Sequence, residues 1–292
     1  MSTPTFDIYV REAGQRHRVH FSGQTALKRG GAGSVWRMPA GRFAGSVAKL
    51  YHDPKQSANR AKLEAMLARP PNDVYLTVGG KRLVQFAWPT YLIEDGAGQC
   101  VGFLMPEVDG NAPRLLVYNE MREAQNRLTA EQRSLHGRVL VAANVATLMA
   151  SLHDLGHSFV DVKDENVLIY PDVGSAAFID CDGFRIDDGR GHVFPAELAT
   201  PEYSSPEYAR GAHPDQLGEL HDRFALAIIL FKLLNYGIHP FQGRPVSQRL
   251  LNKNSFGTVD CIAERLYPYG ARRNPEIEPI RQGRALVVGG GL

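Results

Sequence analysis

The chain has 292 residues, of which 43% are hydrophobic and 22% are charged, and its formal net charge is +2. A chain of this length can bury a substantial core as one large domain or two small ones. The small net charge and the scattered basic residues give no indication of a nucleic-acid or membrane surface. The three cysteines lack metal-like spacing, and the N-terminus lacks the pattern of a secretion signal. We therefore expect reduced thiols in a cytoplasmic protein.

The first hundred or so residues predict mainly β-strands and turns. The β-prone segments are residues 9–21, 25–38, 45–52, 86–95 and 99–108. One helix is expected among them at 57–70, where Pro70 and Pro71 end it.

After Gly110 the sequence predicts helices. Residues 133–156 have the apolar spacing of an amphipathic helix that closes near Gly156, and residues 221–237 are apolar on nearly all sides, as in a buried helix. A β-rich front part and a helical rear part predict two lobes, residues 1–108 and 109–292. A ligand cleft is expected near residues 106–111.

A polar loop interrupts the apolar sequence of residues 159–170, FVDVKDENVLIY. Asp161, Lys163 and Asn166 have the spacing of a protein-kinase catalytic loop. This chemistry needs a carboxylate for the acceptor hydroxyl, a cation for the phosphoryl group and an amide oxygen for a metal. A solvated surface loop is the alternative interpretation.

Two features of the β-rich part fit the same chemistry. The segment KRGGAGSV (28–35) contains Gly30 and Gly33, which could let the backbone close over phosphates, although Lys28 stands where a first glycine is expected and a plain hairpin turn would look similar. Lys49 lies in an apolar strand, where it needs an anion. Glu64, the only acidic residue of the 57–70 helix, is the expected partner, and a surface lysine is the alternative.

Further motifs follow along the chain. Asp180 ends the apolar run of AAFIDCDGF (176–184), where a carboxylate suits Mg²⁺, although Asp182 with the glycine after it could also form a simple turn. Residues 199–208, ATPEYSSPEY, contain Glu207, and Asp222 begins the buried helix, where it could also be a helix N-terminal charge.

In this order and spacing, the motifs resemble those of eukaryotic-type Ser/Thr protein kinases from Leu27 to at least Phe241. The resemblance implies an α+β, bilobal, protein-kinase-like fold with a β-rich N-lobe and a helical C-lobe. It also implies Mg-ATP-dependent transfer of the γ-phosphate to Ser or Thr hydroxyls of a protein, including autophosphorylation.

The same resemblance implies the site residues. The catalytic residues would be Lys49, Glu64, Asp161, Lys163 and Thr200. The residues that contact ATP would be Gly30, Gly33, Val35, Lys49, Met105, Glu107, Val108 and Leu168, with Met105 as gatekeeper and the two residues after Pro106 as the hinge. The ligands of Mg²⁺, or of Mn²⁺, would be Asn166 and Asp180.

A finer resemblance concerns the WP…VGFLMP segment and the DCD sequence at 180–182. They look most like a bacterial branch of these kinases, which occurs with helix-hairpin-helix modules or beside a phosphatase and a von Willebrand-type protein in stress-response triads. The implied partners are a protein substrate and, by the same resemblance, a phosphatase and a von Willebrand-type domain protein. No membrane binding and no direct nucleic-acid binding by this chain are expected.

Several departures from the family pattern keep other functions open. Phe159 and Val160 replace the usual His-Arg, and Cys181 replaces the usual Phe. These changes favour a pseudokinase that binds nucleotide or a partner without catalysis. An aminoglycoside-type phosphotransferase shares the DxxxxN loop, but enzymes of that type lack the TPEYSSPE segment. From the short, polar end of the chain we expect either an incomplete or minimal C-lobe or a fragment of a longer protein. The partner of Glu207 stays open among Arg272, Arg273, Arg281 and Arg284.

Overall fold

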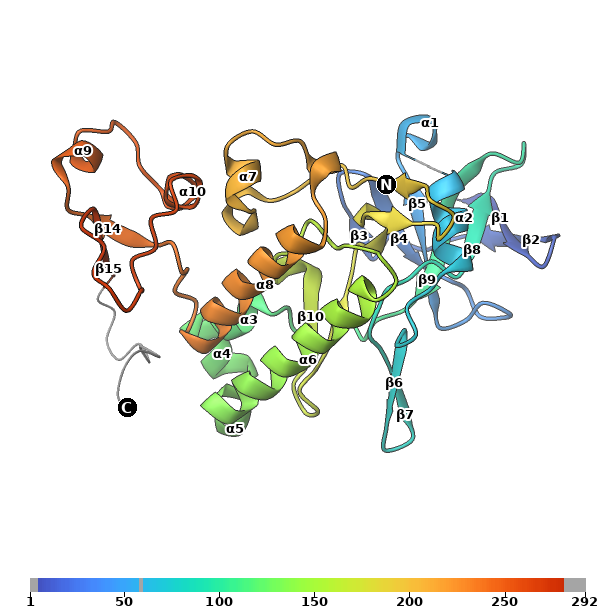
Figure 1. Ribbon diagram of the computed structural model, residues 1–292. Helices are drawn as coiled ribbons and strands as arrows, with labels where there is room; N and C mark the ends of the chain where they lie inside the picture. Colours follow the sequence, from blue (N-terminus) through green and yellow to red (C-terminus); the bar gives the residue numbers. More distant parts are fainter. Residues whose placement is uncertain (1–4, 58–59, 281–292) are drawn as a thin grey trace. The chain divides into compact units, whose positions relative to one another are not determined.

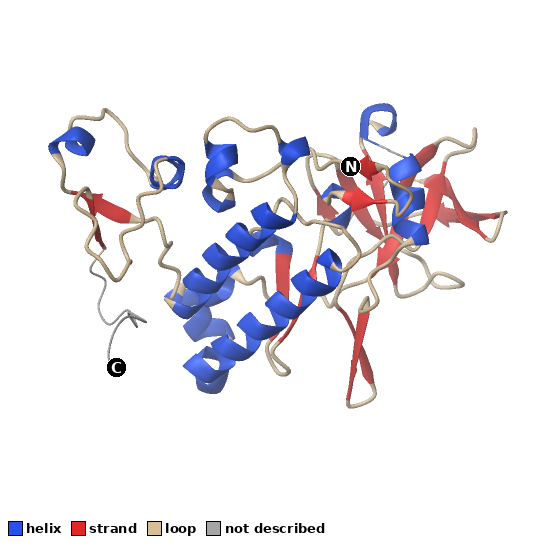
Figure 2. Ribbon diagram, in the orientation of Figure 1, coloured by secondary structure: helices blue, strands red, loops and turns tan. Residues whose placement is uncertain are grey.

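The computed structural model describes residues 5–57 and 60–280. The chain divides into two compact units. Unit 1 comprises Met1–Asn111, Ala177–Asp182 and Ile186–Phe194, and unit 2 comprises Ala112–Ala176, Gly183–Arg185 and Pro195–Leu292. The first unit is built mainly from strands and the second mainly from helices (Figure 2).

The main element of unit 1 is a seven-stranded antiparallel sheet in the order β2-β1-β8-β9-β5-β4-β3 (Figure 1). Its strands are β1 (Phe6–Glu12), β2 (Gln15–Phe21), β3 (Lys28–Arg29), β4 (Gly33–Arg37), β5 (Ser46–Tyr51), β8 (Tyr91–Glu94) and β9 (Cys100–Pro106). The unit also contains α1 (Pro54–Ser57), α2 (Arg60–Ala68) and two hairpins, β6 (Tyr75–Val78) with β7 (Lys81–Val84) and β12 (Ile186–Asp187) with β13 (Val193–Phe194).

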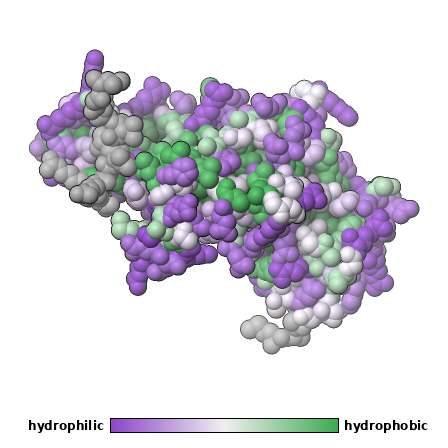
Figure 3. Space-filling view, turned by 90° about the horizontal axis from the view of Figure 1, so that it is seen from below, coloured by the Kyte–Doolittle hydropathy of each residue, from purple (hydrophilic) through white to green (hydrophobic). Residues whose placement is uncertain are grey.

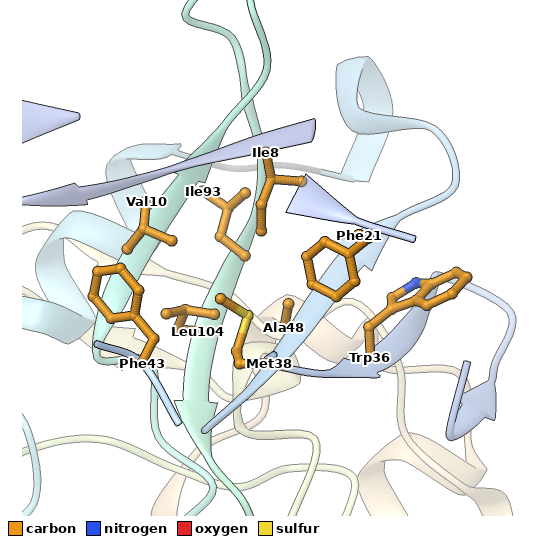
Figure 4. Packing of buried hydrophobic residues seen from close by; sticks show 9 residues of the cluster. All are labelled: Ile8, Val10, Phe21, Trp36, Met38, Phe43, Ala48, Ile93 and Leu104. Carbon is orange, nitrogen blue, oxygen red and sulfur yellow. The ribbon is translucent and has the colours of Figure 1, made fainter. Parts of the chain in front are cut away.

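The two faces of this sheet differ because successive side chains of a strand point to opposite sides. One face carries a buried hydrophobic cluster, in which Trp36, Ala48 and Leu104 follow one another across three paired strands (Figure 4). The cluster consists of Ile8, Val10, Phe21, Trp36, Met38, Phe43, Ala48, Ile93 and Leu104. The neighbouring residues Val35 and Lys49 therefore lie on the opposite face.

Unit 2 is mainly helical. Its helices are α3 (Leu116–Asn119), α4 (Met121–Arg127), α5 (Ala130–Arg133), α6 (Leu135–His153), α7 (Pro206–Ala209), α8 (Glu219–Leu234), α9 (Gln248–Leu251) and α10 (Thr258–Ala263). Its strands are β10 (Val167–Tyr170), which pairs with β11 (Ser175–Phe178), and β14 (Gly243–Pro245), which pairs with β15 (Ile277–Pro279). The last two residues of β11 belong to unit 1. The short 3₁₀ helices of the chain are η1 (Asp164–Asn166), η2 (Cys181–Gly183), η3 (Pro201–Tyr203) and η4 (Pro214–Gln216).

Helices α6 and α8 pack against each other, and Arg138 of α6 is buried beside the end of α8. Its guanidinium donates to the backbone oxygen of Leu233 at 2.7 Å and lies over the ring of Tyr236. A cation at the carboxyl end of a helix is favourable, because the last carbonyl groups lack helical partners. Arg138 therefore stabilises the carboxyl end of α8.

Within the described residues, α6 alone is long and apolar enough to cross a membrane by length and composition. A buried helix of a folded domain meets the same two criteria, and seven residues of α6 are buried. On the face of the molecule seen in Figure 3, hydrophilic residues surround several smaller hydrophobic areas.

Candidate active site

The loop before η1 brings four predicted site residues of unit 2 together. The carboxylate of Asp161 accepts hydrogen bonds from Lys163 Nζ at 2.6 Å and from Thr200 Oγ1 at 2.6 Å, one on each oxygen. The side-chain amide of Asn166 donates to the backbone oxygen of Asp161 at 3.1 Å. Thr200 thus joins this cluster although it is distant in sequence.

A buried carboxylate on α8 holds the loop in place. Asp222 is fully buried, and its two oxygens accept the backbone N–H groups of Phe159 and Val160, each at 2.7 Å. His153 Nε2 is 2.9 Å from the same carboxylate. Val160 has φ 63°, a left-handed conformation that is strained for a β-branched residue. The contacts of Asp222 maintain this strained backbone directly before Asp161.

A second buried carboxylate connects the loop to the far end of α8. Asp164 is fully buried and accepts from Lys232 Nζ at 2.6 Å and from Asn119 Nδ2 at 2.8 Å. Lys232 also donates to the hydroxyl of Tyr203 in the segment after Thr200. The two ends of α8 therefore fix the loop of residues 159–166, through Asp222 and Asp164.

A cavity of about 700 Å³ adjoins this cluster in unit 2. Lys163, Thr200, Glu165, Glu202 and His239 are among its lining residues. Its volume lies in the range of ligand-binding pockets in proteins. The cavity is therefore large enough to receive a side chain or a short segment of a bound molecule next to the Asp161 loop.

The stability of the protein should depend on pH through His239, which lines this cavity. Burial lowers the pKa of His239 to about 4 from an ordinary value of 6.5. The unfolded chain therefore binds more protons between pH 6.5 and pH 4, so stability falls as the pH decreases through this range, by up to ~3 kcal/mol from this residue. We expect urea denaturation at pH 7.0 and pH 4.5 to show a smaller loss for His239→Gln than for the wild type. Equal losses for the two proteins would contradict this assignment.

In unit 1, Lys28, Val35 and Lys49 form a row across β3, β4 and β5 on the sheet face opposite the hydrophobic cluster. Directly opposed residues of an antiparallel pair share a face. Phe103 of β9 continues the row beside Lys49. Val35 and Lys49 thus lie next to each other, as neighbours around one ligand must.

The predicted ion pair between Lys49 and Glu64 is not formed in this structure. Glu64 instead accepts from Arg60 Nε at 2.8 Å, on the exposed surface of α2. Lys49 Nζ is 2.6 Å from Asp182 and 3.6 Å from Asp180. Arg60 precedes Glu64 by four residues, so both side chains lie on the same side of the helix and pair locally.

The electrostatics of Lys49 favour its charged form. Burial alone would lower the pKa of its ammonium group, but the carboxylates of Asp182 and Asp180 outweigh this effect and raise the pKa above its ordinary value. Lys49 is therefore a cation at neutral pH. Burial also raises the pKa of the Cys181 thiol well above its ordinary value, so this cysteine is a protonated packing residue.

The two predicted phosphate-loop glycines have different environments. A Cβ atom on Gly33 would lie 2.5 Å from the backbone oxygen of Leu50, whereas a Cβ atom on Gly30 would approach nothing closer than 3.6 Å. We therefore expect Gly33→Ala to destabilise the protein by about 1–3 kcal/mol, as overpacking does. Gly30→Ala serves as the matched control and should unfold in urea close to the wild-type midpoint. An equal effect of both substitutions would show that close packing on β5 is not the cause.

The residues predicted to contact the adenine base lie on β9, directly after it, and on β10. Met105 is buried on β9 opposite Val47. The amide of Glu107 donates to the backbone oxygen of Gly45 at 3.1 Å, and its carboxylate pairs with Arg37, so this amide is not free for a ligand. Among the described residues, no backbone partner is found for the amide of Val108, the other predicted hinge residue. Leu168 lies on β10 in unit 2, half-buried.

The predicted metal ligands fit a hard divalent cation. Asp180 offers a carboxylate that is 44% exposed, and the amide nitrogen of Asn166 is already bonded, which leaves its oxygen for a cation. Oxygen donors of this kind suit Mg²⁺, which keeps several waters and shares substrate phosphates. The described parts of the chain contain no cluster of three or more His, Cys, Asp or Glu residues suited to a metal. Asp180 has φ 58°, a second strained residue beside a candidate site.

Some contacts were not foreseen from the sequence. The hydroxyl of Tyr51 donates to Asp182 at 3.1 Å. This contact could have been predicted, because Tyr51 lies two residues after Lys49 on a strand and so shares its face. Lys232 pairs with the buried Asp164. A lysine within an apolar helix indicates a buried acidic partner of this kind. The partner of Glu207 is Arg265 at 3.5 Å, not Arg272 or Arg273. Arg281 and Arg284, the other two candidates, lie outside the described residues.

The chain is similar in sequence to known protein kinases over part of its length. No family model matches the chain. The protein kinase YegI of Escherichia coli (strain K12) is 31% identical over 225 residues, which are 75% of this chain and 32% of that protein. The serine/threonine-protein kinase pkn3 of Myxococcus xanthus is 32% identical over 115 residues, 36% of this chain and 20% of its own length.

Among solved structures, a rhoptry kinase from Toxoplasma gondii matches with a TM-score of 0.54 at 14% identity, over 82% of this chain and 68% of that one. The chain therefore has the α+β fold of a protein kinase, and the prediction of this fold is confirmed. Both of these relatives are named as protein kinases. The matched region spans about a third or less of the length of these relatives.

Proposed function

We propose that this chain transfers the γ-phosphate of ATP to Ser or Thr hydroxyls of a protein, itself included, with Mg²⁺ as the metal. One observation carries the proposal. The carboxylate of Asp161 lies within hydrogen-bond distance of both Lys163 Nζ and Thr200 Oγ1, and Asn166 is bonded to the same residue. This set combines a base, a cation and an oxygen donor, which are the groups that phosphoryl transfer requires.

The roles follow from these contacts. A Ser or Thr hydroxyl of the substrate would donate to Asp161, which accepts its proton as the new bond between the hydroxyl oxygen and the γ-phosphorus forms. The bond between that phosphorus and the β-phosphate oxygen breaks, and ADP leaves. Lys163 would stabilise the charge on the transferred group, and Thr200 keeps Asp161 oriented through its 2.6 Å hydrogen bond. Asp180 of unit 1 and Asn166 of unit 2 each offer an oxygen donor to a divalent metal, which would neutralise phosphate charge.

Unit 1 would supply the groups that bind the nucleotide. Lys49 is a charged, nearly buried lysine on the sheet face that also carries Val35. Such a lysine can bind phosphate oxygens, while Val35 offers an apolar surface for the base. In unit 2, the cavity beside Lys163 and Thr200 would receive the acceptor segment of the substrate protein.

Incubation with γ-labelled ATP and Mg²⁺ tests the proposal. We expect label on protein with the wild type and none with Asp180→Asn. Glu264→Gln, a change of a half-buried residue at the end of α10 in unit 2, is the control that should retain labelling. Stabilisation by ATP without any labelling would contradict the kinase proposal and favour the pseudokinase alternative. Label on an added aminoglycoside, with none on protein, would favour the small-molecule phosphotransferase.

We also propose a cytoplasmic location, supported by three free cysteines. The phosphatase and the von Willebrand-type protein are proposed as partners on the resemblance of the WP…VGFLMP segment and the DCD sequence to the bacterial branch. Co-purification of either protein with the full chain tests this proposal. The absence of direct nucleic-acid and membrane binding is likewise proposed from the small net charge.

A further inference from the structure

The strongest unassigned feature is the anion that accompanies Lys49. This lysine has a side chain only 11% exposed, so its charge needs a close counter-charge. Glu64 does not supply one, because its carboxylate is 53% exposed and is bonded to Arg60. The structure provides a different carboxylate at the same ammonium group.

That carboxylate is Asp182. Its Oδ1 lies 2.6 Å from Lys49 Nζ, and its side chain is also only 11% exposed. Its Oδ2 accepts the hydroxyl of Tyr51 at 3.1 Å, so both oxygens are held from the same strand, β5. Two donors two residues apart on a strand lie on one face, and they fix the orientation of the carboxylate as well as its distance.

Asp180 is less suited to this task. It lies 3.6 Å from Lys49 and 3.9 Å from Lys28, and its side chain is 44% exposed. A longer and more exposed contact is weaker than the buried pair. With Lys49 paired to Asp182, the carboxylate of Asp180 remains available for a metal.

We infer that Asp182 is the positioning residue that holds Lys49 against the phosphates of ATP, in the place expected for Glu64. The inference rests on the proposed ATP-dependent function. Asp182 keeps Lys49 charged and fixes the position of its ammonium group, whatever the orientation of α2. Loss of the Asp182 carboxylate should then disturb Lys49, whereas loss of the Glu64 carboxylate should act mainly on the surface of α2.

The test is the affinity of the full chain for ATP and Mg²⁺, measured by calorimetry. We expect Asp182→Asn to weaken binding at least tenfold, and Glu64→Gln to weaken it less than threefold. In a Lys49→Met background, Asp182→Asn should cause little further loss, because the residue that it positions is already gone. Asp73→Asn, in an exposed turn of unit 1, is the matched control for the chemical change.

Two results would overturn the inference. One is a loss for Glu64→Gln that equals or exceeds the loss for Asp182→Asn, and the other is an undiminished effect of Asp182→Asn without Lys49. If Asp182→Asn does not fold, Tyr51→Phe replaces it, with a loss of at least threefold expected and unchanged affinity contradicting the inference. Wild-type protein that binds ATP but transfers no phosphate contradicts the proposed function alone. Wild-type protein that binds no ATP contradicts both.

Discussion

The Asp161→Asn substitution is expected to lower kcat for phosphate transfer by about 10²–10⁴-fold, the contribution typical of a positioned general base. Asparagine keeps the shape of the side chain but removes the charge that pairs with Lys163 at 2.6 Å and the site that accepts a proton. Because the side chain is partly exposed and the loop is held by Asp222, the fold should survive. Steady-state kinetics with γ-labelled ATP, together with circular dichroism of the variant, measure both effects.

The affinity for ATP distinguishes the loss of a general base from a disruption of the whole site. We expect Asp161→Asn to bind ATP within about threefold of the wild type, since the loss concerns the chemical step and not ground-state binding. Asp172→Asn, a carboxylate of unit 2 bonded to Gln132 near the surface, is the control and should keep kcat. Near-normal kcat for Asp161→Asn in folded protein would show that another group acts as the base.

The second large effect is expected for Asp222→Ala, which should reduce the free energy of unfolding by about 3–5 kcal/mol. The substitution leaves the buried amides of Phe159 and Val160 without their 2.7 Å acceptors. It also removes the contacts that keep Val160 at φ 63°. Relaxation of this residue would move Asp161, so activity should fall even at temperatures where the variant is folded. Urea denaturation at pH 7 measures the stability.

Glu219→Ala is the matched control for this experiment. It lies in the first turn of the same helix, but its side chain is 44% exposed and pairs with Arg223. Exposed pairs of this kind contribute about 0.5 kcal/mol. A similar loss of stability for Asp222→Ala and Glu219→Ala would mean that the buried carboxylate does not hold the loop.

Much of the fold could be predicted because its elements have clear periodicity. The β-prone segment 9–21 overlaps the hairpin β1–β2, and the segments 86–95 and 99–108 contain β8 and β9. The predicted helices at 133–156 and 221–237 are present as α6 and α8, whose buried residues recur with helical spacing. The hairpin β6–β7 was missed, although Gly79 and Gly80, both with positive φ, are a typical signal for its turn.

The candidate site was predictable where it depends on local sequence. Asp161, Lys163 and Asn166 lie within six residues, so one loop brings them together. The partner of Lys49 depends on how α2 is turned and on where the 180–182 turn lies, and neither follows from periodicity. A short helix in which Arg60 lies four residues before Glu64 offers a competing local pair that the apolar pattern does not reveal.

The proposed function requires both the cluster around Asp161 and the cluster around Lys49 for the binding of metal-bound ATP. The most direct test is electron paramagnetic resonance of Mn²⁺–ATP titrated with the full chain, using Asp180→Asn in one cluster and Asn166→Ala in the other. We predict that each substitution weakens binding of Mn²⁺–ATP by tenfold or more. Unchanged binding after either substitution, in a folded variant, would contradict the claim.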